Sequence, residues 1–197
     1  MTWIRKTPLF KGQRISLISL ERSHFDNLIG ISKDKRIWSH YAIDGSDTNK
    51  LTSSLEDALI EKEKGIQYPF CIVLQTDKKI IGSTRFLDIL PEHKKLEIGW
   101  TWLHPNYWGT NINLECKFHL LTYCFEELLT KRVQLKTDET NIRSRKAIEK
   151  IGGQFEGILR NDMIRDNGTS RNSAYYSITD NEWVATKKNL LKMMKSK

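Results

Sequence analysis

The middle of the chain reads Lys95-Leu-Glu-Ile-Gly-Trp-Thr-Trp-Leu-His-Pro-Asn-Tyr-Trp-Gly-Thr-Asn-Ile-Asn113. Its first nine residues alternate between two faces, with Leu96, Ile98, Trp100 and Trp102 on one and Glu97, Gly99, Thr101 and Leu103 on the other. This alternation predicts a β-strand over residues 95–103, and Pro105 ends it because proline has no N–H for a sheet. Residues 104–113 then form a loop that leads into a helix.

That helix is predicted over residues 112–129, because apolar side chains recur there at steps of three and four: Leu114, Phe118, Leu121, Phe125, Leu128 and Leu129. The start of a helix presents unpaired N–H groups and a partial positive charge. A glycine-containing loop at this position can therefore hold a pyrophosphate through backbone amides. On these residues alone, an ordinary connecting loop remains the alternative.

Strands and helices are also predicted on both sides of this stretch. Strands are expected at 14–20, 70–75, 80–88, 133–137, 155–160 and 171–178; helices are expected after a Ser23 cap, at 52–64, at 144–151 before Gly152 and Gly153, and from 181 onward. Asp166-Asn-Gly168 predicts the turn of the last hairpin. The order indicates one α+β domain over residues 1–197, a mixed and mostly antiparallel sheet flanked by helices, with 181–197 as a C-terminal helix or tail.

Composition limits the class of protein further. The 197 residues are 39% hydrophobic and 28% charged, which is ordinary for a globular domain. No apolar run reaches the roughly 18 residues that cross a bilayer, and no signal peptide is evident, so a cytoplasmic protein is expected. The net charge of +8 favours anionic partners. Cys71, Cys116 and Cys124 are expected to be buried, reduced thiols, and the five histidines lack the spacing of metal ligands, so no metal is expected.

Two motifs together resemble a known family. Asn106-Tyr-Trp-Gly-Thr-Asn111 is similar to the phosphate loop Arg/Gln-x-x-Gly-x-Gly/Ala of the GCN5-related N-acetyltransferases (GNAT). Asn141-Ile-Arg-Ser144, followed by Glu149-Lys-Ile-Gly152, resembles the second-half motif of the branch that includes ribosomal-protein-alanine acetyltransferases. The resemblance spans about residues 10–185. Asn111 replaces the second small residue of the loop; if this position needs a positive φ, it must rely on the tolerance of asparagine for the left-handed region.

This resemblance implies transfer of an acetyl group from acetyl-CoA to a primary amine, either a protein N-terminus or a small amine. The backbone amides that would hold the pyrophosphate belong to Trp108, Gly109, Thr110, Asn111, Ile112 and Asn113. The strand edge at Thr101, Trp102 and Leu103 would pair with the pantetheine arm, which the Asn141 side chain also contacts in the family. Arg143 and Lys146, beside Arg145, are candidates for the 3′-phosphate, although a solvated helix face is the alternative.

The chemistry requires a base, because an alkyl ammonium has a pKa near 10 and cannot attack while protonated. Glu97 is the candidate base, expected on the same strand face as Thr101; a solvent-facing or ion-paired glutamate is the alternative. Ser144 is the residue that the resemblance assigns to protonation of the departing sulfur, and a helix cap is its alternative. No covalent enzyme intermediate is implied.

The acceptor and the assembly stay open at this stage. Six aromatic residues line an acceptor pocket or, more commonly for such side chains, belong to the core: Trp38, Tyr41, Trp100, Trp102, Tyr107 and Trp108. A homodimer is compatible with the sequence. The competing function is a basic binding protein on the same fold that has lost turnover and recognises nucleic acid or an acidic protein. Nucleic acid is the less favoured partner, since basic residues are scattered among acidic ones.

Overall fold

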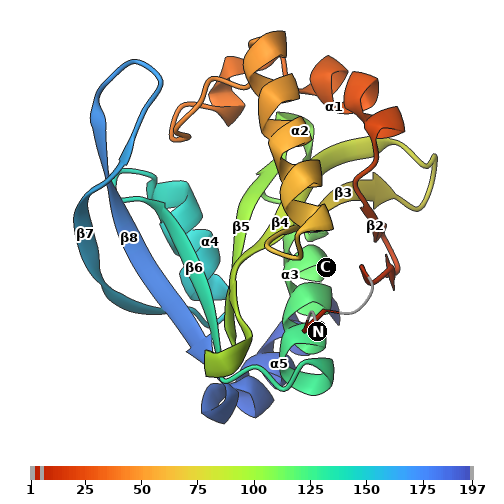
Figure 1. Cartoon of the computed structure of the whole chain (residues 1–197). Helices are drawn as coiled ribbons and strands as arrows, with labels where there is room; N and C mark the ends of the chain where they lie inside the picture. The colour runs from red at the N-terminus through yellow and green to blue at the C-terminus, as the bar shows by residue number, and fades with distance from the viewer. Residues whose placement is uncertain (1–2, 5–6, 196–197) are drawn as a thin grey trace.

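The computed structural model describes residues 3–4 and 7–195 and contains one eight-stranded sheet (Figure 1). The strands lie in the order β1-β2-β3-β4-β5-β6-β8-β7. Only β5 and β6 pair in parallel; the other neighbours are antiparallel. The bounds are β1 Phe10–Lys11, β2 Ile15–Ser19, β3 Tyr68–Leu74, β4 Ile80–Leu90, β5 Lys95–Leu103, β6 Arg132–Asp138, β7 Gln154–Ile164 and β8 Ser170–Thr179. The predicted α+β class and the mostly antiparallel sheet are confirmed.

Helices cover both faces of this sheet (Figure 1). Their bounds are α1 Phe25–Ile31, α2 Thr48–Glu63, α3 Ile112–Thr122, α4 Ile142–Lys150 and α5 Asp180–Lys195, and a π-helical turn, Tyr123–Glu127, extends α3. One buried cluster packs α1 and α2 against the sheet, and a second, larger cluster packs α3, α4 and α5. The predicted C-terminal helix is therefore present to Lys195, and residues 196–197 lie outside the described part. Among the described residues, no helix has the length and apolar character to cross a bilayer.

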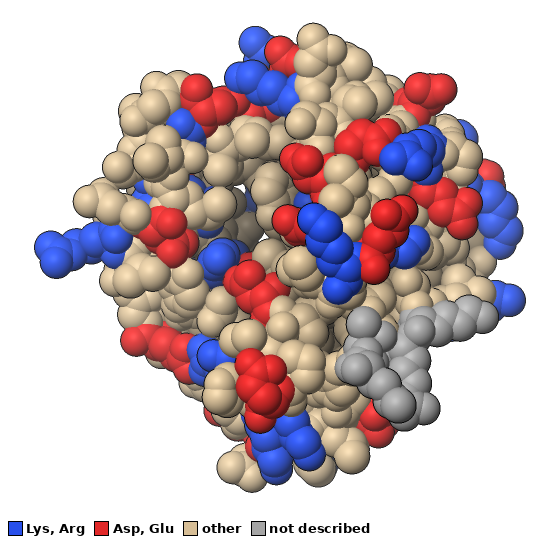
Figure 2. All heavy atoms as spheres, in the orientation of Figure 1, with Lys and Arg blue, Asp and Glu red and all other residues tan. Residues whose placement is uncertain are grey.

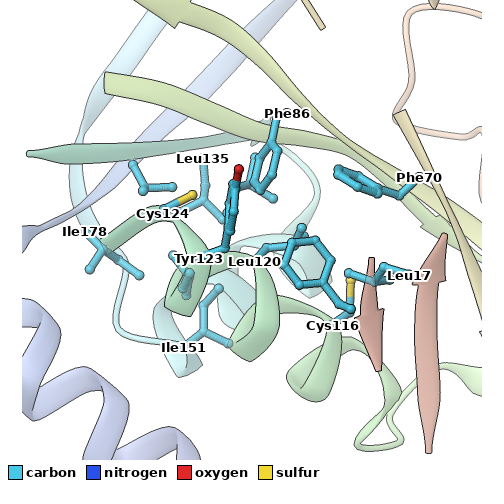
Figure 3. Packing of buried hydrophobic residues seen from close by; sticks show 14 of the residues in the cluster. Leu17, Phe70, Phe86, Cys116, Leu120, Tyr123, Cys124, Leu135, Ile151 and Ile178 are labelled. Atoms are coloured by element: carbon cyan, nitrogen blue, oxygen red, sulfur yellow. The ribbon is translucent and has the colours of Figure 1, made fainter. Parts of the chain in front are cut away.

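The larger cluster is built around aromatic and aliphatic side chains from the sheet and α3 (Figure 3). Phe70 and Phe86 meet edge to face with ring centroids 5.4 Å apart, and Tyr123 stacks on Phe86 at 6.0 Å. Cys116 and Cys124 also lie in this cluster, and Cys71 lies in the other. All three thiols are buried and form no disulfide, as the sequence predicted.

The first two helices do not begin as predicted, and α4 and α5 begin slightly earlier than expected, at Ile142 and Asp180. Ser23 does not cap α1; it lies inside a short 3₁₀ turn, Arg22–His24, whose cap is Glu21. The second helix begins at Thr48 rather than Thr52, because the Asp47 carboxylate accepts hydrogen bonds from the amides of residues 49 and 50, at 2.8 and 3.2 Å. An aspartate before the first turn satisfies amides that have no partner inside the helix.

The predicted strict alternation along β5 is wrong because the strand contains a bulge. Trp100 has φ +50°, and the pairing with β4 skips from Gly99 to Trp102. An inserted residue shifts which side chains face which side of a sheet. Ile98 therefore packs in the cluster with α3, whereas Trp102 packs in the cluster with α1 and α2.

The bulge also separates two predicted site residues. Glu97 alternates with Leu96 and Ile98, so it points away from α3. The Thr101 hydroxyl instead accepts a hydrogen bond from α3, at 2.6 Å from Lys117 Nζ. The expectation that Glu97 and Thr101 share one face of the strand is therefore wrong.

The parallel pairing of β5 with β6 is short. It joins Lys95–Glu97 only to the first residues of β6, Arg132 to Gln134. Beyond this point the two strands diverge in the ribbon view (Figure 1), so their later residues do not pair with each other. Strand edges in the middle of the sheet are therefore left without a neighbouring strand, which makes this gap the natural place for a ligand.

Candidate functional site

A cavity of about 430 Å³ occupies the region where β5 and β6 diverge. The space-filling view shows a hollow in the face between α2 and the strands β6, β8 and β7 (Figure 2). Most of the residues predicted for catalysis and cofactor binding line this cavity: Glu97, Thr101, Trp102, Leu103, Trp108, Gly109, Asn113, Asn141, Arg143 and Ser144. Thr110, Asn111, Ile112 and Lys146 do not line it.

The loop before α3 has the backbone geometry of an anion cradle. Gly109 has φ +72°, and a Cβ added there would meet no atom within 4 Å. The Trp108 amide donates to the Pro105 carbonyl at 3.0 Å, and the Ile112 amide donates to the Thr110 hydroxyl at 3.3 Å. Those two amides are therefore used internally.

The other amides of the loop remain open. Within the described part of the chain, no group accepts a hydrogen bond from the amides of Gly109, Thr110, Asn111 or Asn113. Asn111 has φ −76°, so this position does not need the left-handed conformation; Gly109, with φ +72°, supplies the turn. Four open amides at the start of an 11-residue helix suit a phosphate group.

Buried polar atoms in the same place also lack partners. Among the described residues, Asn113 Oδ1 accepts no hydrogen bond and Asn111 Nδ2 donates none, although both atoms are buried. Asn113 additionally lines the cavity. A buried polar group without a partner is costly, so these atoms fit a site that is completed by a polar ligand such as coenzyme A.

Arg143 is the cation that the structure brings to this loop. Its guanidinium carbon lies 3.5 Å from the centre of the Trp108 ring, and the Trp108 indole donates to the Leu103 carbonyl at 2.9 Å. Arg145 instead turns to the Tyr176 hydroxyl at 2.9 Å. Lys146 is exposed and lies outside the cavity. Only one of the three neighbouring cations is thus held against the loop.

Glu97 lies deep at the other end of the cavity and is 2% exposed. Its Oε2 accepts a hydrogen bond from Gln134 at 2.8 Å and lies 3.4 Å from Lys136 Nζ. Lys136 also lies 3.8 Å from a carboxylate oxygen of Asp88. Burial raises the pKa of Glu97 above its ordinary value, and Lys136 offsets part of this rise. Glu97 is ion-paired and also lies at the cavity wall. An ion-paired glutamate and a candidate base were the alternatives from the sequence, and this position is compatible with both.

Ser144 is not the cap of α4. Asn141 is that cap, and its Oδ1 accepts the Ser144 amide at 3.1 Å. The Ser144 side chain is half-buried and lines the cavity. The hydroxyl is therefore available to a ligand, whereas the Asn141 oxygen already has a structural partner.

The aromatic residues divide between core and cavity. Trp38 is 4% exposed and packs on Trp102 with ring centroids 5.2 Å apart; it does not line the cavity. Tyr41 and Trp100 do line it, and the Tyr41 hydroxyl donates to the Thr101 carbonyl at 2.6 Å. Trp102 belongs to both groups. Trp38 is therefore a core residue, Tyr41 and Trp100 are cavity residues, and Trp102 is both.

Lys117 is a cavity residue that the sequence analysis missed. It lies on α3, is 5% exposed and donates to the Thr101 hydroxyl at 2.6 Å. Burial lowers its pKa to about 8. A signal was present, since Lys117 lies three residues after Leu114 and four before Leu121, on the apolar face of the predicted helix.

Comparisons with known proteins agree with this fold and site. The family model described as "Acetyltransferase (GNAT) domain" matches residues 14–154. The "Putative ribosomal N-acetyltransferase YdaF" of Bacillus subtilis (strain 168) is 32% identical over 111 residues, which are 56% of this chain and 60% of that protein. A crystal structure described as a "putative acetyltransferase" is 30% identical with a TM-score of 0.83, covering 92% of this chain and 91% of the other.

A structure of the microcin C7 self-immunity acetyltransferase MccE, in complex with acetyl-CoA and AMP, has a TM-score of 0.74 over 85% of this chain and 93% of that one; at 22% identity it shows the fold alone. The chain belongs to the GNAT family of acetyltransferases. It is an N-acetyltransferase, and its relatives include one named as a putative ribosomal N-acetyltransferase, so the resemblance found in the sequence is confirmed.

Charge on the visible face does not favour the competing nucleic-acid function. Lys and Arg side chains alternate with Asp and Glu over this face and form no continuous basic surface (Figure 2). Several cations of the described chain form ion pairs, including Arg22 with Glu56 and Lys50 with Asp166. A phosphate backbone is bound by unpaired cations arranged along one path.

Proposed function

We propose that the protein transfers an acetyl group from acetyl-CoA to a primary amine by direct attack within a ternary complex. The observation that carries the proposal is a single cavity with open loop amides at Gly109 at one end and the buried Glu97 carboxylate at the other. A thioester held from the loop reaches along β5 toward the carboxylate, where an amine can be deprotonated.

Coenzyme A would be held by the loop and by the free edge of β5. The loop 108–113 would hold the pyrophosphate through the amides of Gly109, Thr110, Asn111 and Asn113, because the amides of Trp108 and Ile112 donate within the loop. The edge formed by Thr101, Trp102 and Leu103 pairs with the pantetheine arm. The Asn141 amide group adds a contact, while its oxygen continues to cap α4. Arg143 and the exposed Lys146 are proposed for the 3′-phosphate.

The reaction needs a proton acceptor for the amine. Glu97 removes a proton from the ammonium, directly or through a water, and the neutral amine attacks the thioester carbonyl carbon. The C–N bond forms, the C–S bond breaks with its electron pair on sulfur, and the second proton of the attacking nitrogen passes to that sulfur as the amide forms. Ser144 donates a hydrogen bond to that sulfur. Burial raises the pKa of Glu97, which makes this carboxylate a stronger base than a solvent-exposed glutamate.

Two classes of acceptor are proposed, a protein N-terminus and a small amine. The first is supported by the relative named as a ribosomal N-acetyltransferase. The second is supported by the depth of Glu97, which a free small amine reaches more easily than a folded protein does. We place the enzyme in the cytoplasm, where its three buried thiols stay reduced.

Release of free CoA thiol tests the proposal. Wild-type protein is incubated with acetyl-CoA and either N-terminal peptides or small amines, and mass spectrometry identifies the acetylated product. Thiol release that depends on one acceptor class supports the function and selects the class. No acetylated product with either class, at protein concentrations where acetyl-CoA binds, would refute it.

A further inference from the structure

Lys117 is a buried cation that forms no ion pair with any residue of the described chain. Its side chain leaves α3 and ends at the Thr101 hydroxyl of β5, with Nζ and Oγ1 2.6 Å apart. The Thr101 oxygen is also 2.7 Å from the Thr84 hydroxyl of β4. Among the described residues, no carboxylate forms an ion pair with Lys117. A buried ammonium that meets only hydroxyls is costly, so this arrangement favours an anion in the adjacent cavity.

The position of Lys117 along the cavity suggests which anion arrives there. Leu103 lies beside the phosphate loop, and Gly99 is four residues back along β5, about 13 Å away at the rise of a strand. Thr101 lies between them. A pantetheine arm that enters at Leu103 and extends toward Glu97 therefore brings its sulfur close to Thr101 and to the ammonium bound there.

The other charged groups around this point do not neutralise Lys117. Glu97 acts on it through space from the opposite face of β5 and is itself paired with Lys136 of β6. Cys116, its neighbour on α3, is a buried thiol whose pKa burial raises to about 11, so it carries no charge at neutral pH. Thr84 and Thr101 are neutral. Lys117 is thus the cation at this point of the cavity that keeps its charge free for a ligand.

We propose that Lys117 stabilises the thiolate of coenzyme A as it departs, pairing with the sulfur when the C–S bond breaks. This inference rests on the proposed function. The first ammonium proton goes to Glu97 and the electron pair of the C–S bond stays on sulfur. The ammonium of Lys117 balances the new negative charge until the sulfur takes up the second proton, which the nitrogen releases as the amide forms. Lys117 therefore acts on the leaving group, with the Ser144 hydroxyl as a neutral second donor.

The decisive experiment measures the pKa of the CoA thiol when it is bound to the protein, from the ultraviolet absorbance of the thiolate as pH rises. The buried Cys71 and Cys116 thiols have pKa values of about 12 and about 11, so they stay protonated over the working range. Lys117→Met keeps the length and removes the charge, Lys117→Arg keeps the charge, and Lys192→Met changes an exposed lysine on α5 as a control.

The inference predicts that bound thiol ionises at least tenfold more readily in the wild type and in Lys192→Met than in Lys117→Met, with partial recovery in Lys117→Arg. It also predicts that Lys117→Met lowers kcat about 10²-fold, the scale of one lost donor to a developing charge, with little change in KM for acetyl-CoA. An unchanged thiol pKa in a Lys117→Met protein that still binds CoA would overturn the inference while leaving acetyl transfer intact. Failure of the wild type to bind CoA or to acetylate any amine would instead refute the proposed function.

Discussion

Replacing Glu97 by glutamine removes the proposed base while keeping the size and the hydrogen bond from Gln134. A positioned base contributes about 10²- to 10⁴-fold, which corresponds to about 3–5 kcal/mol of barrier. At pH 7 only about one in 2,500 molecules of an alkyl amine with a pKa near 10.4 is neutral. Without the base, turnover must depend on that fraction. We therefore expect kcat/KM of Glu97→Gln to fall by about 10²-fold or more at pH 7 and to recover about tenfold for each pH unit up to pH 9.

The pH profile of the wild type gives a second measure of the same group. Because burial raises the pKa of Glu97, the acid limb of kcat/KM should lie above the ordinary glutamate value of about 4.3. The linked effect on stability has a definite sign. A raised folded-state pKa means that the favourable contribution of Glu97 is complete below its unfolded pKa and is lost as pH rises through the folded pKa. Urea unfolding at pH 8 should thus find Glu97→Gln at least as stable as the wild type.

The assay is steady-state thiol release from acetyl-CoA with a saturating amine between pH 5.5 and pH 9. Glu92→Gln, in the exposed turn between β4 and β5, is the matched control and should behave as the wild type. Wild-type kcat/KM and an unaltered pH profile in Glu97→Gln would show that another group, or solvent, takes the proton.

Three further changes test other parts of the structure. Gly109→Ala forces a side chain into φ +72°, at a cost of about 1 kcal/mol, and should weaken acetyl-CoA binding severalfold in calorimetry. An unchanged affinity for acetyl-CoA would show that this loop does not bind the phosphate. Asn141→Ala should lower the free energy of unfolding by about 1 kcal/mol, because the helix cap is lost, and should also raise KM for acetyl-CoA. Asn141→Asp keeps the capping oxygen and should raise KM alone. Equal losses of stability in the two variants would show that Asn141 does not cap α4. Leu120→Ala, at a fully buried position, should cost about 2–5 kcal/mol in urea unfolding, and a loss below 1 kcal/mol would contradict the packing.

Much of the architecture could be predicted because local patterns dominate it. The hairpin of β7 and β8 follows from its Asn-Gly turn, and α3 follows from apolar spacing that the sheet then buries. Gly152, with φ +99°, ends α4 as expected. The loop before α3 was placed correctly because its position between a strand and a helix needs no long-range information.

The remaining features depend on contacts between distant segments. The bulge at Trp100 is set by pairing with β4, which alternation along one strand does not reveal. The apolar spacing around Lys117 indicates a buried helix face, but its partners Thr101 and Thr84 meet it only once α3 packs on the sheet. Glu97 was found for its chemistry, but its partners Gln134 and Lys136 come from the parallel pairing of β5 with β6. These residues shape the cavity, and their partners are known only once distant segments have packed together.

The central claim is that the cavity binds acetyl-CoA through the loop at Gly109 for transfer to an amine. Calorimetric titration of the wild type with acetyl-CoA tests it most directly, with double-stranded DNA at two salt concentrations as the comparison. We predict that acetyl-CoA binds with micromolar affinity and that Gly109→Ala weakens this binding. We also predict no salt-dependent binding of DNA. Absence of acetyl-CoA binding together with DNA affinity that falls steeply with salt would contradict it and would indicate a binding protein on an acetyltransferase fold.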